Sequence, residues 1–74
     1  MENLDAVKAL ITVMQSSAYP PDVRVGAAEG LGYTGFTAAR EALDTVMKSS
    51  AYPPAVRAAA AKALGRAVGV ATRK

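Results

Sequence analysis

The hexapeptide Ser-Ser-Ala-Tyr-Pro-Pro occurs twice in this chain, at residues 16–21 and again at residues 49–54. Paired prolines cannot continue a helix, and the residue before a proline is pushed towards an extended conformation. The second proline suits the first position of a new helix, because its missing N–H would have no partner there. Each hexapeptide therefore predicts a turn that ends one helix and opens the next.

The two hexapeptides belong to a longer duplication with a period of 33 residues. When residues 6–35 are aligned with residues 39–68, 18 of the 30 pairs are identical. A fixed period between about 20 and 50 residues is typical of solenoids, whose units bury one face only against a neighbouring unit. We therefore expect a single domain over residues 1–74, with a first repeat at residues 3–35, a second repeat at residues 36–69 and a basic C-terminal tail at residues 70–74.

Each repeat contains two helical patterns, so the chain should be all-α with four short helices. Apolar residues recur at spacings of three and four before the first hexapeptide, as in Val7, Leu10 and Met14, and predict an amphipathic first helix. The second helix of each repeat should end near Gly32 and near Gly65. Glycine readily takes the left-handed conformation that closes many helices.

Composition argues against catalysis. Cysteine and histidine are both absent, which excludes disulfides, thiolate nucleophiles, imidazole ligands and the usual proton shuttle of neutral pH. The six carboxylates form no convincing acid–base pair by spacing. We therefore predict no enzyme activity, no catalytic or metal-binding residues and no cofactor.

The chain also lacks signals for a membrane. No uninterrupted apolar run approaches the roughly 20 residues that span a bilayer. The first five residues, Met-Glu-Asn-Leu-Asp, are acidic, whereas a signal peptide begins with basic residues. We expect a soluble, cytoplasmic protein without membrane contact.

The second helix of the first repeat carries a set of spaced residues: Asp22-Val23-Arg24, Ala27-Ala28 and Leu31-Gly32. This set resembles the second-helix signature of HEAT repeats, especially the short variety named after phycobilisome lyases. The second repeat carries most of it again, as Val56-Arg57, Ala60-Ala61 and Leu64-Gly65. The resemblance implies an α-α superhelix of two antiparallel helical hairpins, with second helices along the inner surface, used as a scaffold for protein contacts.

The resemblance also implies a structural role for three charged residues. In HEAT repeats, an aspartate at the inter-helix turn and an arginine two residues later commonly form a ladder along the stack. Here Arg24 would bond Asp22 within the repeat, and Arg57 would reach back to Asp22. The second repeat departs from this pattern, because Ala55 replaces the aspartate.

Differences between the two repeats indicate surfaces for partners. By helical spacing, one face of the second helices should be exposed to solvent. It carries Val25, Glu29 and Tyr33 in the first repeat, and Lys62 and Arg66 in the second. We predict that these five residues bind a protein partner.

A second surface involves the first helix. Val7 and Ile11 correspond to charged residues in the second repeat, and Leu4 extends the same apolar strip. A second copy of the chain or a partner helix could cover this strip, which makes self-association one hypothesis. The other is that the strip packs within the four helices.

Charge leaves an alternative function open. Residues 1–36 hold two basic and four acidic groups, whereas residues 37–74 hold seven basic and two acidic groups. The basic end, which includes Lys62, Arg66, Arg73 and Lys74, could dock nucleic acid. We favour a protein-interaction or scaffold module, with nucleic-acid binding as the alternative. An accessory role in a bilin lyase-like system rests on the resemblance alone.

Overall fold

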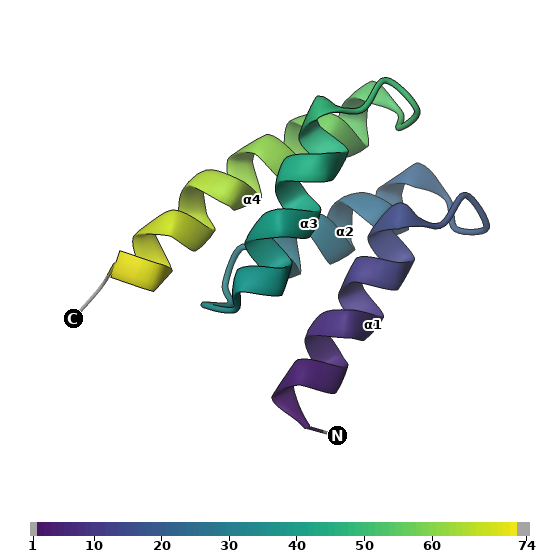
Figure 1. Ribbon diagram of the computed structural model, residues 1–74. Coiled ribbons are helices and arrows are strands. Elements are labelled where there is room, and N and C mark those ends of the chain that lie inside the picture. Colours follow the sequence, from purple (N-terminus) through teal and green to yellow (C-terminus); the bar gives the residue numbers. More distant parts are fainter. Residues whose placement is uncertain (1, 73–74) are drawn as a thin grey trace.

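The computed structural model describes the backbone of residues 2–72 and the side chains of residues 2–69. This part of the chain forms four helices and no strand: α1 (Asn3–Gln15), α2 (Pro21–Leu31), α3 (Thr37–Lys48) and α4 (Pro54–Thr72). The all-α prediction and the two helical hairpins are confirmed (Figure 1).

Both Ser-Ser-Ala-Tyr-Pro-Pro segments form turns, as predicted. Pro20 has an extended backbone, with φ −62° and ψ 155°, and Pro21 opens α2. In each turn the first serine hydroxyl accepts a hydrogen bond from a backbone N–H two residues later. The distance is 3.1 Å at Ser16 and 3.2 Å at Ser49. Local bonds of this kind favour turns over helix continuation, so the same hexapeptide produces the same turn twice.

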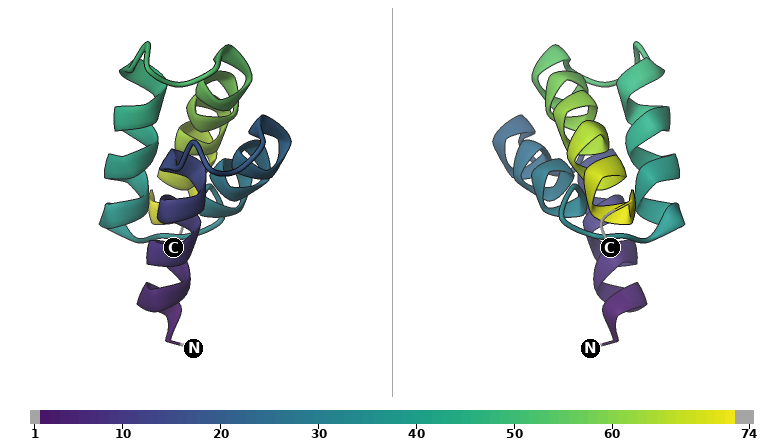
Figure 2. Two further views of the ribbon diagram at one scale, coloured as in Figure 1. Left: turned by 90° about the vertical axis from the view of Figure 1, so that its right-hand side faces the viewer. Right: turned by 90° about the vertical axis from the view of Figure 1, so that its left-hand side faces the viewer.

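The two hairpins stack mainly through their second helices. α2 packs against α4 about as extensively as each hairpin packs internally, whereas α1 and α3 contact each other much less. Figures 1 and 2 show α1 and α3 running roughly parallel but offset along their length. The α1–α2 and α3–α4 turns lie at one end of the molecule, and the start of α1 protrudes at the opposite end. The α-α superhelix predicted for HEAT-like hairpins is therefore confirmed, with its tight contact between second helices.

The core is built largely from alanine. Its largest fully buried side chains are Met14, Leu31, Leu43, Val46 and Val56. Small side chains let helix backbones approach closely, as they do at Gly32. A Cβ atom at Gly32 would lie 3.0 Å from the Cα and Cβ atoms of Ala63 on α4. The glycine at this position therefore serves the contact between repeats.

α2 ends at Leu31 with Gly32 as its C-cap, as predicted, but two other expectations about helix ends were wrong. Gly32 follows α2 with a right-handed backbone, φ −65° and ψ −15°, and no glycine among residues 2–72 has a positive φ. α4 does not end near Gly65 but continues to Thr72. The first repeat has Thr34 and Gly35 where the second has Ala67 and Val68, and the side chain of Ala67 is fully buried. Helix-forming residues and this burial favour continuation of α4.

Part of the predicted C-terminal tail belongs to α4. Residues 70–72, assigned to a basic tail, have helical backbone. The tail's two basic residues, Arg73 and Lys74, lie outside the described residues.

Candidate functional site

Tyr33, the second residue after α2, is the most exposed large apolar residue in the described part of the chain, with 68% of its surface accessible. The Cζ atom of Arg66 on α4 lies 4.7 Å from the centroid of the Tyr33 ring. These residues occupy equivalent positions in the two repeats. An exposed cation–π pair contributes about 0.5–1 kcal/mol. The contact therefore orients the two side chains more than it stabilises the fold.

Three further residues were predicted for this face. Glu29 and Lys62 are exposed, one helical turn before Tyr33 and Arg66 respectively. Val25 is different, because it is half-buried and packs against the core. Burial of its apolar side chain outweighs the exposure that the helical spacing indicated. We call Glu29, Tyr33, Lys62 and Arg66 the second-helix edge.

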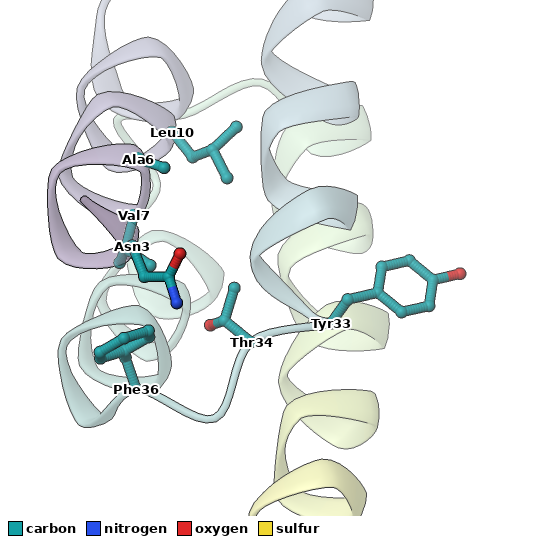
Figure 3. A pocket seen from close by; sticks show the side chains of 7 residues that line it. All are labelled: Asn3, Ala6, Val7, Leu10, Tyr33, Thr34 and Phe36. Carbon is teal, nitrogen blue, oxygen red and sulfur yellow. The ribbon is translucent and has the colours of Figure 1, made fainter. Parts of the chain in front are cut away.

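A shallow apolar pocket lies between α1 and the segment that joins α2 to α3. Its volume is about 290 Å³, near the lower limit of about 300 Å³ for pockets that bind small molecules. The lining residues are Asn3, Ala6, Val7, Leu10, Tyr33, Thr34 and Phe36. In Figure 3, the Tyr33 ring points away from the other six side chains. Apart from Tyr33, the lining offers only an amide and a hydroxyl as polar side-chain groups, so it holds no acid–base pair.

The apolar strip predicted on α1 is divided between core and surface. Val7 is 2% exposed and belongs to the core. Ile11 is half-buried and packs against the same core, whereas Leu4 exposes 43% of its surface. For Val7 the structure agrees with the hypothesis that the strip packs within the four helices. Val7 cannot form a surface for self-association while the chain is folded.

The two equivalent arginines make the same contact in their own hairpins. Arg24 is 6% exposed, and its Nε–H donates a hydrogen bond of 3.0 Å to the carbonyl of Met14. The Nε–H of Arg57 donates to the carbonyl of Met47 at 3.2 Å. Carbonyls in the last turn of a helix lack helical partners and lie at the negative end of its dipole. Each arginine therefore ties a second helix to the end of the first.

The predicted ladder through Asp22 is not formed. Asp22 is exposed, and its Oδ1 accepts a hydrogen bond of 2.9 Å from the backbone N–H of Val23. Among residues 2–72, the only ion pair joins Lys48 to Asp44. Arg24 instead lies with its Cζ 5.4 Å from the ring centroid of Tyr52 in the other repeat. One helix carbonyl, that of Met14, and the ring of Tyr52 thus replace the carboxylate as partners of Arg24.

Sequence reasoning missed these arginine contacts, although a signal was present. A methionine precedes each arginine by ten residues, and both residues are identical in the two repeats. The pocket was also missed, because Asn3, Thr34 and Phe36 come together only through the packing of α1 on the α2–α3 segment. No group of three or more acidic side chains that could hold a metal ion occurs in the described part of the chain.

Comparison with known proteins identifies the repeat type. A family model described as HEAT repeats matches residues 5–72, which is most of the chain. No curated protein and no solved structure matches significantly. The matching model does not distinguish the phycobilisome-lyase variety, so that finer assignment stays a prediction. None of the helices described here is long and apolar enough to cross a membrane.

Proposed function

Because the chain belongs to the HEAT repeat family, we propose that it is a non-enzymatic interaction module whose second-helix edge binds a protein partner. HEAT repeats generally mediate protein–protein contacts or scaffolding, and the family is generally non-enzymatic. These family properties support the class of function. The residues proposed to carry it come from the geometry of this chain.

The observation that carries the proposal is the pairing of Tyr33 and Arg66. Tyrosine and arginine are enriched among the residues that dominate interface energies. Here the ring is 68% exposed and the guanidinium lies 4.7 Å from its centroid. A side chain that is already oriented loses less conformational freedom when a partner binds. The pair is therefore a suitable anchor for a protein surface.

The charges beside this pair favour a partner that is itself mixed in charge. Glu29 and Lys62 are exposed and occupy equivalent positions, so the edge presents both signs. A protein surface that binds nucleic acid usually presents clustered positive charge to the phosphate backbone. The carboxylate of Glu29 on the same edge as Lys62 and Arg66 opposes that kind of partner.

Site-specific photo-crosslinking tests the proposal. A photo-reactive amino acid would replace Tyr33, and in a control variant it would replace Thr45, which is exposed on α3. After irradiation in the native cells, the Tyr33 variant should form a protein adduct that the Thr45 variant does not form. Substitution of Arg66 by alanine should reduce its yield.

Two outcomes would contradict the proposal. Equal adducts from Tyr33 and Thr45 would indicate non-specific collisions. A Tyr33 adduct that disappears with nuclease would indicate nucleic acid. In that case the affinity for the nucleic acid should also fall steeply with salt, because each neutralised phosphate releases counterions.

A further inference from the structure

Residues that are identical in the two repeats differ in burial. Ala28 on α2 is fully buried, whereas its counterpart Ala61 on α4 is exposed. The reverse holds at the other end, where Val56 is fully buried and its counterpart Val23 exposes 44% of its surface. In each pair, the buried residue lies on the side of its repeat that faces the other repeat. Its exposed counterpart lies on the same side of a repeat that has no further repeat packed against it. The chain therefore presents, at its two ends, the same two faces that meet inside it.

The residues of the outer face of the second repeat are those whose counterparts in the first repeat are buried. Met14, Ala28, Leu31 and Gly32 are all buried. Their counterparts Met47 and Leu64 are half-buried, and Ala61 and Gly65 are exposed. We call Met47, Arg57, Ala61, Leu64 and Gly65 the tail face.

The face at the start of the first repeat is defined in the same way. Leu43, Val46, Val56, Ala59 and Ala63 are buried in the second repeat. Their counterparts Leu10, Val13 and Gly30 are half-buried, and Val23 and Gly26 are exposed. We call these five counterparts the head face. The tail face matches its side of the internal contact in every residue type, and the head face matches the other side except that Gly26 and Gly30 replace Ala59 and Ala63.

Gly65 supports the same arrangement. Inside the chain, a Cβ at Gly32 would lie 3.0 Å from Ala63, so close packing there requires glycine. Gly65 lies in the interior of α4, where glycine costs about 1 kcal/mol relative to alanine. A Cβ at Gly65 would meet nothing within 4 Å. No contact within the described chain accounts for this glycine, whereas a stacked second copy would bring Gly30 against it.

Charge and aromatic contacts fit a second copy of the chain. The half that carries the head face is acidic, with four acidic and two basic groups, and the half that carries the tail face has seven basic and two acidic groups. Inside the chain, Arg24 lies over the ring of Tyr52. The equivalent contact between copies would bring Arg57 over Tyr19, which is 42% exposed. Opposite charge steers such faces together.

We propose that the tail face of one copy docks on the head face of another, repeating the contact between the two hairpins. Such a contact is heterologous, so it adds copies in one direction and does not close at a dimer unless the rotation forms a ring. This inference concerns surfaces other than the second-helix edge. Its test does not depend on whether that edge binds a partner.

Variants that block one face each provide the test. Ala61→Glu alters the tail face, and Ala55→Glu is its control with the same charge change at an exposed position whose counterpart, Asp22, stays exposed. Val23→Arg alters the head face, and Thr12→Arg is its control. All four positions are exposed, so circular dichroism should show that every variant folds.

Sedimentation velocity over a wide concentration range reads out the result. The unaltered chain and both controls should grow beyond a dimer as concentration rises, and each blocked variant should remain a single chain. A mixture of the two blocked variants should form a one-to-one dimer and nothing larger, because it retains one tail face and one head face. A single-chain mass for the unaltered protein throughout, or no dimer in the mixture, would overturn the proposal. Dimers of Val23→Arg alone would also overturn it, because they would show a symmetric contact.

Discussion

Gly32 faces Ala63 at the junction of the two repeats so closely that a Cβ at Gly32 would lie 3.0 Å from the Cα, Cβ and carbonyl oxygen of Ala63. The counterpart of Gly32 is Gly65, and it has open space around it. The same residue type in equivalent positions thus has opposite steric surroundings. This contrast gives the first prediction.

Alanine at these two positions should change stability in opposite directions. Gly32→Ala should lower the free energy of unfolding by about 1–3 kcal/mol, because backbone atoms of Ala63 would have to move. Gly65→Ala should raise it by about 1 kcal/mol, because alanine favours a helix interior. Urea denaturation of dilute protein measures both. Equal effects at the two sites would show that the repeats do not approach closely at Gly32.

Removal of the arginine side chains should also affect the two repeats unequally. Arg24→Met would leave the Met14 carbonyl without its donor at a buried site, at a cost of about 1–3 kcal/mol. Arg57→Met should cost less, because the bond to Met47 is only partly buried and water can replace the donor. Denaturation midpoints of the two variants decide the matter, and a larger loss at Arg57 would contradict this account.

The valines of the second helices form a further matched pair. Val56 is fully buried and Val23 is 44% exposed, although each is the third residue of its helix. Val56→Ala should destabilise the chain by about 1–2 kcal/mol, because it removes buried methyl groups and leaves a cavity. Val23→Ala should change stability by less than about 0.5 kcal/mol. If both substitutions lower the stability by the same amount in dilute solution, the Val23 side chain must be buried in the single chain, which would contradict the structure.

The Tyr33–Arg66 contact is measurable by a double-mutant cycle. Tyr33→Ala, Arg66→Ala and the double variant should give a coupling energy of about 0.5–1 kcal/mol, as for other exposed cation–π pairs. Thermal unfolding of the four proteins provides the data. A coupling energy of zero would mean that the two side chains do not hold each other, and would remove the orientation argument for the second-helix edge.

Local sequence patterns predicted the turns and most helix bounds. The Pro-Pro pairs set the start of α2 at Pro21 and the start of α4 at Pro54, because proline acts on its own backbone and on the residue before it. The end of α4 was not predictable in this way. The continuation of this helix past Gly65 rests on helix-forming residues and also on the burial of Ala67, which exists only once α4 packs on its neighbours.

The candidate site was predicted in part, for a similar reason. Helical spacing placed Glu29, Tyr33, Lys62 and Arg66 on one exposed face, and all four are exposed. It also placed Val25 there, because a period of 3.6 residues does not report which side of a helix a second helix covers. The partners of Arg24, a carbonyl on α1 and a ring in the other repeat, depend on packing between segments that are far apart in sequence.

Disulfide trapping tests most directly the claim that the end faces repeat the internal contact. The chain has no cysteine, so Gly65→Cys and Gly30→Cys introduce single thiols on the tail face and the head face. In the stack these positions should face each other as Gly32 faces Ala63, within reach of a disulfide after a small adjustment. Under mild oxidation, a mixture of the two variants should form a covalent heterodimer faster than Gly65→Cys mixed with Thr12→Cys. Equal rates in the two mixtures would contradict the account.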